Sequence, residues 1–148
     1  MNFSVPEQKP TENESTATPV FQSEGPFFDV KGDPSRRFMH YILRGQWESD
    51  TVDALVAAYE PIAQAMEATG GITHTLVDAV HFEELTAEIA DRFPAIVRAA
   101  NPSPTKRTAI VMPQMVNRVM ARPVAEMINA RFFNTVDAAR EWLFSDEA

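Results

Sequence analysis

The chain of 148 residues contains no cysteine, only five glycines and no long apolar run. The absence of cysteine excludes disulfide bonds, a thiolate nucleophile and cysteine-ligated zinc. The glycine-rich motifs that cradle phosphates are also missing, since Gly70-Gly71 is the only adjacent pair of glycines. No stretch approaches the roughly 18 consecutive apolar residues that a membrane-spanning helix requires, so no transmembrane segment is predicted.

Basic residues are in the minority, with 13 Lys and Arg against 21 Asp and Glu and a formal net charge of −8. Binding to a nucleic-acid backbone requires a basic surface that releases counterions, and the few basic residues here are scattered. We therefore expect no nucleic-acid partner. The first residues, MNFSVPEQKPTENES, have neither the basic nor the apolar region of a secretory signal, which predicts a cytoplasmic protein.

The remaining composition indicates one folded domain behind an N-terminal arm. A chain of 148 residues, 45% of them hydrophobic, is long enough for a single core and too short for two ordinary domains. Residues 1–24 are rich in Pro, Glu, Ser and Thr and show no apolar periodicity, which predicts a flexible arm. The folded domain is predicted to cover residues 25–148.

Strand-like and helix-like segments alternate along this domain. Two apolar runs, 26–30 and 38–43, flank a turn sequence and predict a β-hairpin. The further elements alternate between helix and strand, at about 50–69, 73–80, 83–100, 108–112, 114–130, 131–133 and 136–143. This order predicts an α/β fold with a mixed, mainly parallel sheet of about five strands, whose first hairpin strand is antiparallel at one edge.

Apolar spacing predicts which helix faces are buried. In the first helix the inward set is Val52, Leu55, Tyr59, Ile62 and Met66, and Ser49-Asp50 are expected to cap it. In the 114–130 helix the apolar set expected to pack on the sheet is Met115, Val119, Met120, Val124, Met127 and Ile128. Pro61, Pro94 and Pro123 fall inside helical patterns and predict kinks or breaks, because proline removes a backbone donor.

The segment TLVDAVHFEEL, residues 75–85, holds the candidates for chemistry. Asp78 is expected at the carboxyl end of a strand, where open α/β sheets bind ligands; alternatively, it accepts hydrogen bonds from the following loop. His81, Glu83 and Glu84 extend an acidic cluster, but their spacing matches no metal-binding motif, so no metal is predicted. No catalytic motif is found, and neither enzymatic activity nor a cofactor is predicted.

Short motifs in a fixed order carry a resemblance to a known family. They are Leu43-Arg44-Gly45, Leu76-Val77-Asp78, Ala109-Ile110-Val111 and the closing segment 133–143, FNTVDAAREWL. Over about residues 25–144 the chain resembles the STAS fold and, more closely, the bacterial SpoIIAA-like (STAS/SEC14-like) family. The resemblance implies a single sheet with helices mostly on one face. It also implies a protein without established enzymatic activity that binds another protein or a small apolar ligand.

The anti-sigma-factor antagonists of this fold carry a phosphorylated hydroxyl in an Asp-Ser-Ser/Thr-Gly signature at the start of a helix. Here the matching place, residues 82–87, reads FEELTA, and Thr86 is the only hydroxyl in it. Glu83 and Glu84 resemble a permanently charged state, but acidic residues also suit any helix N-terminus. The phosphorylation switch is therefore not expected in this chain.

The sequence favours two functions, and a hydrolytic or metal-dependent enzyme built on Asp78, His81 and Glu84 stays open beside them. The first is a non-catalytic binding or regulatory module that docks a protein partner or itself through the face around Thr86 and the methionine-rich region; a homodimer is expected if Phe27, Met39 or Tyr41 lies on an uncovered sheet face. The alternative is a carrier or sensor of a small apolar, lipid-like ligand. Its crevice between sheet and helices is predicted to be lined by Phe93, Met112, Met115 and Met120.

Overall fold

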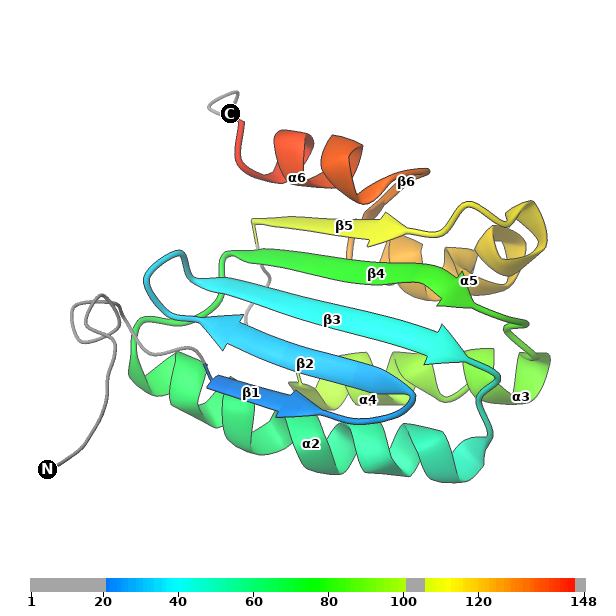
Figure 1. Cartoon of the computed structure of the whole chain (residues 1–148), viewed down its shortest axis with the longest axis horizontal. Helices are drawn as coiled ribbons and strands as arrows, with labels where there is room; N and C mark the ends of the chain where they lie inside the picture. The colour runs from blue at the N-terminus through cyan, green and yellow to red at the C-terminus, as the bar shows by residue number, and fades with distance from the viewer. Residues whose placement is uncertain (1–20, 101–105, 146–148) are drawn as a thin grey trace, which may run out of the picture.

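A six-stranded sheet forms the centre of the protein, and its strands lie side by side in the order in which they occur in the sequence (Figure 1). The structure, a computed structural model, describes residues 21–100 and 106–145. The strands are β1 (Phe21–Glu24), β2 (Phe28–Asp33), β3 (Phe38–Gly45), β4 (His74–Phe82), β5 (Arg107–Val111) and β6 (Arg131–Phe133). The pairs β1–β2 and β2–β3 are antiparallel and the other three pairs are parallel, so the predicted α/β class is confirmed.

The predicted boundary between arm and domain is wrong for Phe21–Glu24. These residues, which the composition assigned to the arm, form β1 and pair with β2 along their whole length. Phe21 packs against the core, and this contact explains why so short a strand is held at the edge of the sheet. The sheet therefore has six strands instead of about five. The rest of the predicted arm, residues 1–20, lies outside the described residues.

In the described part of the chain, five helices cover the two faces of the sheet unequally (Figure 1). They are α2 (Ser49–Ala68), α3 (Ala87–Ala90), α4 (Phe93–Ala100), α5 (Met115–Met127) and α6 (Val136–Leu143). Side chains of α2 to α5 share a larger core with one face of the sheet, and those of α6 share a smaller core with the opposite face. Within the described residues, no helix has both the length and the apolar character needed to cross a bilayer.

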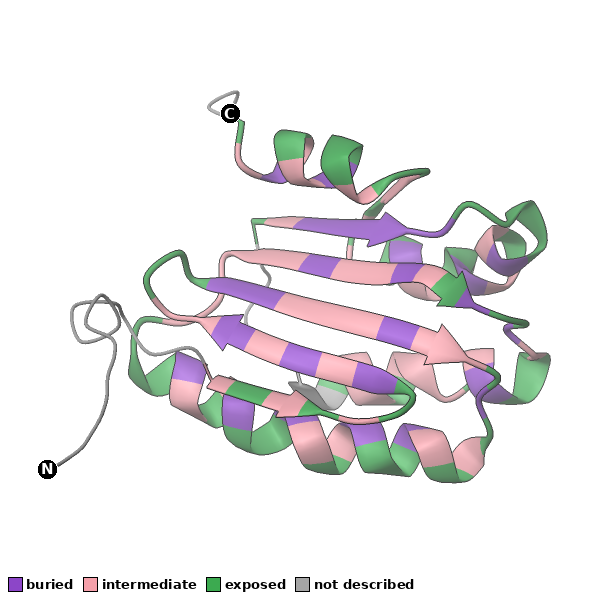
Figure 2. Ribbon diagram, in the orientation of Figure 1, coloured by how far each residue is buried: buried purple, intermediate pink, exposed green. Residues whose placement is uncertain are grey.

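The strand β3 separates the two cores. Phe38 is buried in the smaller core, whereas Met39 and Leu43 are buried in the larger one, as the alternation of side chains along a strand predicts. Figure 2 shows the buried positions as bands along β2, β3 and β4. Tyr41 also packs against the larger core. The prediction that Met39 or Tyr41 lies on an uncovered apolar face is therefore wrong, and only Phe27 of that set is exposed, at 39%.

The helix α2 buries the face that the apolar spacing predicts: Val52, Leu55, Tyr59, Ile62 and Met66. It begins after Glu48, and not after the predicted caps at positions 49 and 50, because Glu48 and Thr51 form a capping box. Pro61 does not split the helix. It is exposed, as is Ala57 one turn before it, so water can bond the carbonyl that proline leaves without a donor.

The predicted continuous helix over 83–100 is wrong. Residues 83–86 form a loop, and the helical part is divided into the short α3 and the separate α4. Pro94 is the second residue of α4, in the first helical turn, where the missing N–H of proline costs no intrahelical bond. Proline therefore starts a second helix here instead of kinking a single one.

The helix α5 turns only half of its predicted apolar set to the core. Its buried residues are Asn117, Ala121 and Ala125. Met120 packs against the core, and Val124 and Ile128 line the cavity between sheet and helices, as predicted. The prediction is wrong for Met115, Val119 and Met127, which are exposed at 64%, 55% and 40%. The buried face is held by small alanines, and by the Asn117 amide, which bonds to the backbone of the 83–86 loop.

Candidate functional site

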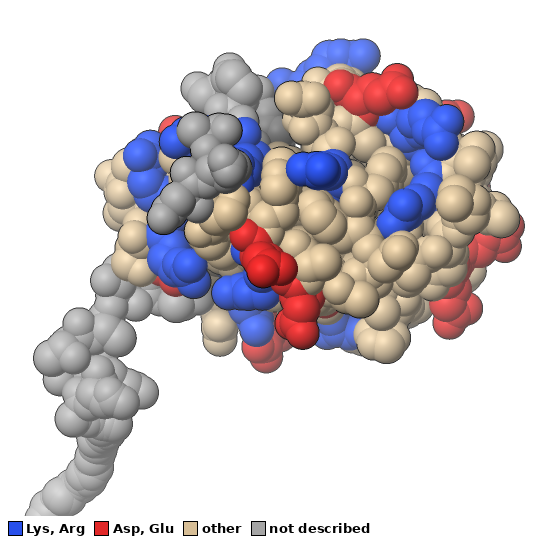
Figure 3. All heavy atoms as spheres, turned by 90° about the horizontal axis from the view of Figure 1, so that it is seen from above, with Lys and Arg blue, Asp and Glu red and all other residues tan. Residues whose placement is uncertain are grey.

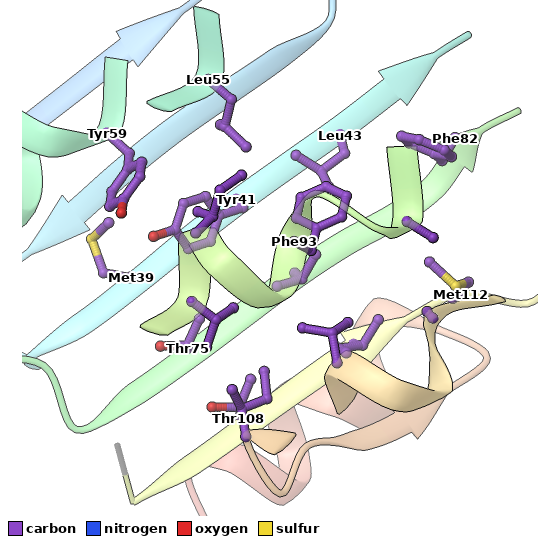
Figure 4. A pocket seen from close by; sticks show the side chains of 18 of the residues that line it. Met39, Tyr41, Leu43, Leu55, Tyr59, Thr75, Phe82, Phe93, Thr108 and Met112 are labelled. Carbon is purple, nitrogen blue, oxygen red and sulfur yellow. The ribbon is translucent and has the colours of Figure 1, made fainter. Parts of the chain in front are cut away.

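An apolar cavity of about 180 Å³ lies between the sheet and the helices of the larger core (Figure 4). The strands β3, β4 and β5 form one wall, and α2, α3, α4 and α5 contribute to the other. Among the described residues that line it, none is charged. Its volume is somewhat larger than the engineered cavity of about 150 Å³ that stays dry and binds benzene. A small apolar molecule therefore fits this space.

Small side chains on the helices leave the cavity open. Ala63 of α2, Ala90 of α3 and Ala121 of α5 face it, at positions where a leucine would reach toward the sheet. On α5 the exposed apolar side chains Met115, Val116, Val119 and Met127 do not border the cavity, whereas Val124 and Ile128 do.

Paired residues of the sheet wall lie in rows across β3, β4 and β5. Two of these rows are Met39, Thr75 and Thr108, followed by Tyr41, Val77 and Ile110. The threonines belong to the row nearest the amino-terminal ends of the parallel strands. Toward the carboxyl ends the wall is apolar, with Leu43, Phe82 and Met112. The polar groups of the cavity are therefore gathered at one end.

Two tyrosines complete this polar end. The rings of Tyr41 and Tyr59 meet edge to face, with 6.4 Å between their centroids. In Figure 4 both hydroxyl groups point into the space that Thr75 also borders. Burial raises the pKa of the Tyr41 hydroxyl, and the neighbouring Tyr59 raises it further. Burial likewise raises the pKa of Tyr59, so both groups keep their protons at neutral pH and can donate hydrogen bonds.

The residues predicted to line a crevice are divided by the structure. Phe93 and Met112 line the cavity. Met115 instead points outward from α5, and Met120 is half-buried but does not border the cavity. The polar lining residues were missed. Their signal in the sequence is a tyrosine or threonine at an inward position of an otherwise apolar face, as at Tyr59 in α2.

The sequence predicts that Asp78 lies at the end of its strand. This prediction is wrong, because β4 continues to Phe82. Between the pairs Ile42–Asp78 and Arg44–His81 the strand β4 has one residue more than β3, which is a β-bulge. The Asp78 carboxylate accepts a hydrogen bond from the backbone N–H of Val80 inside this bulge, at 3.1 Å. The carboxylate therefore serves the alternative role, as a local acceptor.

The bulge also decides which core receives the end of β4. Strict alternation from Val77, which packs in the larger core, would turn Phe82 to the opposite face. The additional residue reverses the alternation, and Phe82 is buried in the larger core, where it lines the cavity. His81 is left exposed.

The remaining candidates in and next to the 75–85 segment, Glu83, Glu84 and Thr86, do not come together in one site. The side chains of Glu83 and Glu84 are exposed, and their backbone groups bond to the side chains of Asn117 and Gln46. The Thr86 hydroxyl caps α3 by accepting a hydrogen bond from the Ile89 N–H at 3.4 Å. Over residues 21–100 and 106–145, no three His, Asp or Glu side chains come together in a way that holds a metal ion.

Arginines on the α6 side of the molecule stack on aromatic rings. The Arg36 guanidinium lies 3.9 Å from the centre of the Phe144 ring, and Arg140 lies 5.5 Å from that of Phe38. Seen from above, the Lys and Arg side chains form separate groups divided by uncharged and acidic surface (Figure 3). The contacts of Arg36 and Arg140 join α6 and its last turn to the sheet.

Comparison with known proteins identifies no relative of this chain. No protein-family model, no curated protein and no solved structure matches it. The resemblance to the SpoIIAA-like family therefore stays a prediction from the sequence, and the cavity, with its polar end at Tyr41, Tyr59 and Thr75, is the site on which a function can be argued.

Proposed function

We propose that the protein is a non-catalytic module that binds a small apolar molecule in the cavity between its sheet and its helices. The observation that supports this most directly is the cavity of about 180 Å³, lined in the described part of the chain by uncharged residues alone. Binding in such a space is driven by removing the apolar surface of the ligand from water. The sequence resemblance to SEC14-like proteins points to the same class of ligand.

A ligand bound in the cavity is expected to stabilise the folded chain. Any molecule that binds the folded state and not the unfolded state shifts the unfolding equilibrium toward the folded state, and the stabilisation grows with the concentration of the ligand.

The lining groups suit binding rather than chemistry. Over the described residues, the cavity presents no carboxylate, imidazole or amine that transfers a proton. Its hydroxyls belong to tyrosines whose pKa is raised by burial and to threonines. A hydroxyl needs an adjacent base to act as a nucleophile, and the described lining contains none.

The direct test has two steps: ligand binding in the cavity is detected first, and the cavity is then occupied by a larger side chain. We expect native mass spectrometry after gentle purification to show an additional small mass, and titration of the full chain with toluene to shift the NMR signals of the lining methyl groups. Ala121→Leu places three more carbon atoms at the cavity. We expect this variant to bind toluene at least tenfold more weakly, while its unfolding temperature equals or exceeds that of the wild type.

The matched control is Ala54→Leu, the same change on the exposed side of α2. It leaves the cavity unchanged, so toluene affinity is expected to match that of the wild type. If toluene binds equally to wild type and Ala121→Leu, its site is elsewhere and the proposed function is wrong. The same conclusion follows if the wild type neither retains a ligand nor binds toluene.

A second function is favoured by the outward face of α5. We define the α5 stripe as the exposed apolar residues Met115, Val116, Val119, Pro123 and Met127. Arg122 and Glu126 lie one turn apart along one edge of it. In an antiparallel helix pair related by a two-fold axis, equal edges face each other, so Arg122 of one copy meets Glu126 of the other. We propose that this stripe pairs with a second copy of the chain.

Self-association is measured by analytical ultracentrifugation of the full chain over a range of concentrations. We expect a dimer whose dissociation constant rises at least tenfold in Val119→Glu, because a carboxylate then enters an apolar contact. Ala138→Glu, on the exposed side of α6, is the control. A wild type that stays monomeric at millimolar concentration would exclude the pairing.

A further inference from the structure

The polar end of the cavity contains hydroxyl groups that the protein itself does not use. Within the described residues, the side-chain hydroxyls of Tyr41, Tyr59 and Thr75 line the cavity and form no hydrogen bond with another protein group. On the sheet wall Tyr41 pairs with the apolar Val77, and Thr75 pairs with Met39 on one side and with Thr108 on the other. These three hydroxyls therefore face the cavity with free capacity to donate and accept.

These hydroxyls are open to the space of the cavity. Among the described residues, His40 Nε2 is the only fully buried side-chain N or O atom without a hydrogen-bond partner, so water can bond to the three hydroxyls while no ligand is present. Phenylalanine at position 41 and valine at position 75 would fill nearly the same volume without offering a hydroxyl. The chain instead carries Tyr41 and Thr75 here, beside Tyr59. A ligand with a hydrogen-bonding group can take the place of that water, because it gives these hydroxyls a partner.

The rest of the lining restricts the charge of that ligand. An ionised group inside a protein needs an opposite charge or several hydrogen bonds, and desolvation otherwise excludes it. Over residues 21–100 and 106–145, no charged residue lines the cavity. Two tyrosines and a threonine offer only neutral donors and acceptors. The lining thus accepts a neutral polar group and rejects a carboxylate or an ammonium.

We infer that the cavity recognises a small neutral amphipathic molecule. Its single hydroxyl or carbonyl group bonds to the polar end at Tyr41, Tyr59 and Thr75, and its apolar body lies toward Leu43 and Met112. This inference rests on the proposed function, since it requires a ligand in the cavity. Beyond the proposed function, the inference states that one end of the ligand is recognised by hydrogen bonds and that the ligand is uncharged.

The experiment compares phenol, toluene and benzoate at neutral pH by NMR titration of the full chain. Phenol and toluene have nearly the same shape and differ in one hydroxyl against one methyl group, whereas benzoate is ionised. Each is titrated into the wild type and into Tyr41→Phe, Tyr59→Phe and Thr75→Val, which keep the side-chain volume. We expect at least one of these variants to weaken phenol binding about fivefold, the value of one hydrogen bond. Toluene affinity should change less than about twofold, and benzoate should bind at least tenfold more weakly than phenol.

Failures of the two proposals give different results. If toluene and phenol bind but all three variants leave the ratio of their affinities unchanged, the inference is overturned while the proposed function stands; the hydroxyls then bond to water. Binding of benzoate as tight as that of phenol also overturns it. If neither toluene nor phenol binds the wild type, the proposed function fails and the inference fails with it. Because each variant removes one hydroxyl or replaces it with a methyl, unfolding temperatures within a few degrees of the wild type are expected and are measured alongside.

Discussion

The side chain of Asn117 holds the backbone of Leu85 from inside the core. Its Oδ1 accepts the Leu85 N–H at 2.9 Å, and its Nδ2 donates to the Glu83 carbonyl at 2.8 Å. Gln46 makes the same pair of bonds to both backbone groups of Glu84, at 3.2 and 2.9 Å. Asn117 is 2% exposed, whereas Gln46 is exposed. Two amides, one buried and one in water, thus fix the loop between β4 and α3.

This pair allows a matched test of what burial adds to a hydrogen bond. Asn117→Ala leaves a buried N–H and a carbonyl without partners, so we expect the free energy of unfolding to fall by roughly 2–4 kcal/mol. Gln46→Ala exposes its partners to water, and a loss below about 1 kcal/mol is expected. Urea denaturation of both variants measures the difference. Equal losses would show that Asn117 is not a central support of the loop.

The lowered pKa of the buried His40 predicts that the stability of the protein depends on pH. Burial lowers its pKa below the ordinary 6.5, against the attraction of Asp78, which raises it; Arg140 and Lys31 lower it further. The unfolded chain then binds the proton more tightly than the folded one. The contribution of His40 to stability is therefore complete above about pH 6.5 and is lost as pH falls through the lowered folded pKa. Thermal unfolding between about pH 7 and pH 5 shows this loss.

The variant His40→Phe separates the contribution of His40 to the pH dependence of stability from the contributions of other titratable groups. It keeps a ring against Phe38, whose centroid lies 5.7 Å away, and it removes Nε2, which is buried without a hydrogen-bond partner. We expect its unfolding temperature to fall less between about pH 7 and pH 5 than that of the wild type. His81→Gln changes an exposed histidine and is the control. An unchanged pH profile in His40→Phe would assign the effect to another residue.

Thr86 and Thr135 perform the same capping function at two helices. Each hydroxyl accepts a hydrogen bond from the backbone N–H three residues later, at 3.4 Å for Thr86 and 3.2 Å for Thr135. We expect Thr86→Ala and Thr135→Ala each to lower the free energy of unfolding by about 1 kcal/mol, and the two Ser variants to restore most of it. If Thr86→Ala is as stable as the wild type, the hydroxyl serves another purpose than capping.

Phe144 fastens the end of α6 to the sheet. Its ring meets Phe38 edge to face at 5.1 Å, stacks on His74 at 5.4 Å and lies under Arg36. We expect Phe144→Ala to cost roughly 2–4 kcal/mol, near the lower end of values for core aromatic residues because this ring is only half-buried. Hydrogen exchange should become faster in α6 and remain unchanged in α2. Equal acceleration in both helices would mean that α6 does not unfold separately.

Sequence patterns were sufficient to predict a helix or strand where one of its faces is apolar and the other is polar. The buried set of α2 and the alternation of β3 follow from such patterns, and β6 and α6 have the predicted bounds. In α6 the cap at Thr135 is also a local signal, since a threonine precedes the apolar spacing. These elements are determined by their own residues.

The errors concern elements whose position depends on distant contacts. The helix α5 has apolar residues around most of its circumference, and the face it buries is selected by the bonds of Asn117 to another loop. The strand β1 is short and half polar, and only its pairing with β2 makes it a strand. The bulge in β4 is likewise a property of the pair, since it depends on the register with β3. The cavity combines these features, so its polar end was not predicted.

The order of the strands in the sheet bears on how the protein is made. Each strand pairs only with those before and after it in the sequence, so no strand must be inserted between two that are already joined. The sheet can therefore grow from β1 toward β6 while the ribosome is still releasing the chain. Each new edge remains open only until the next strand emerges, which shortens the time in which a partly synthesised chain can aggregate with others.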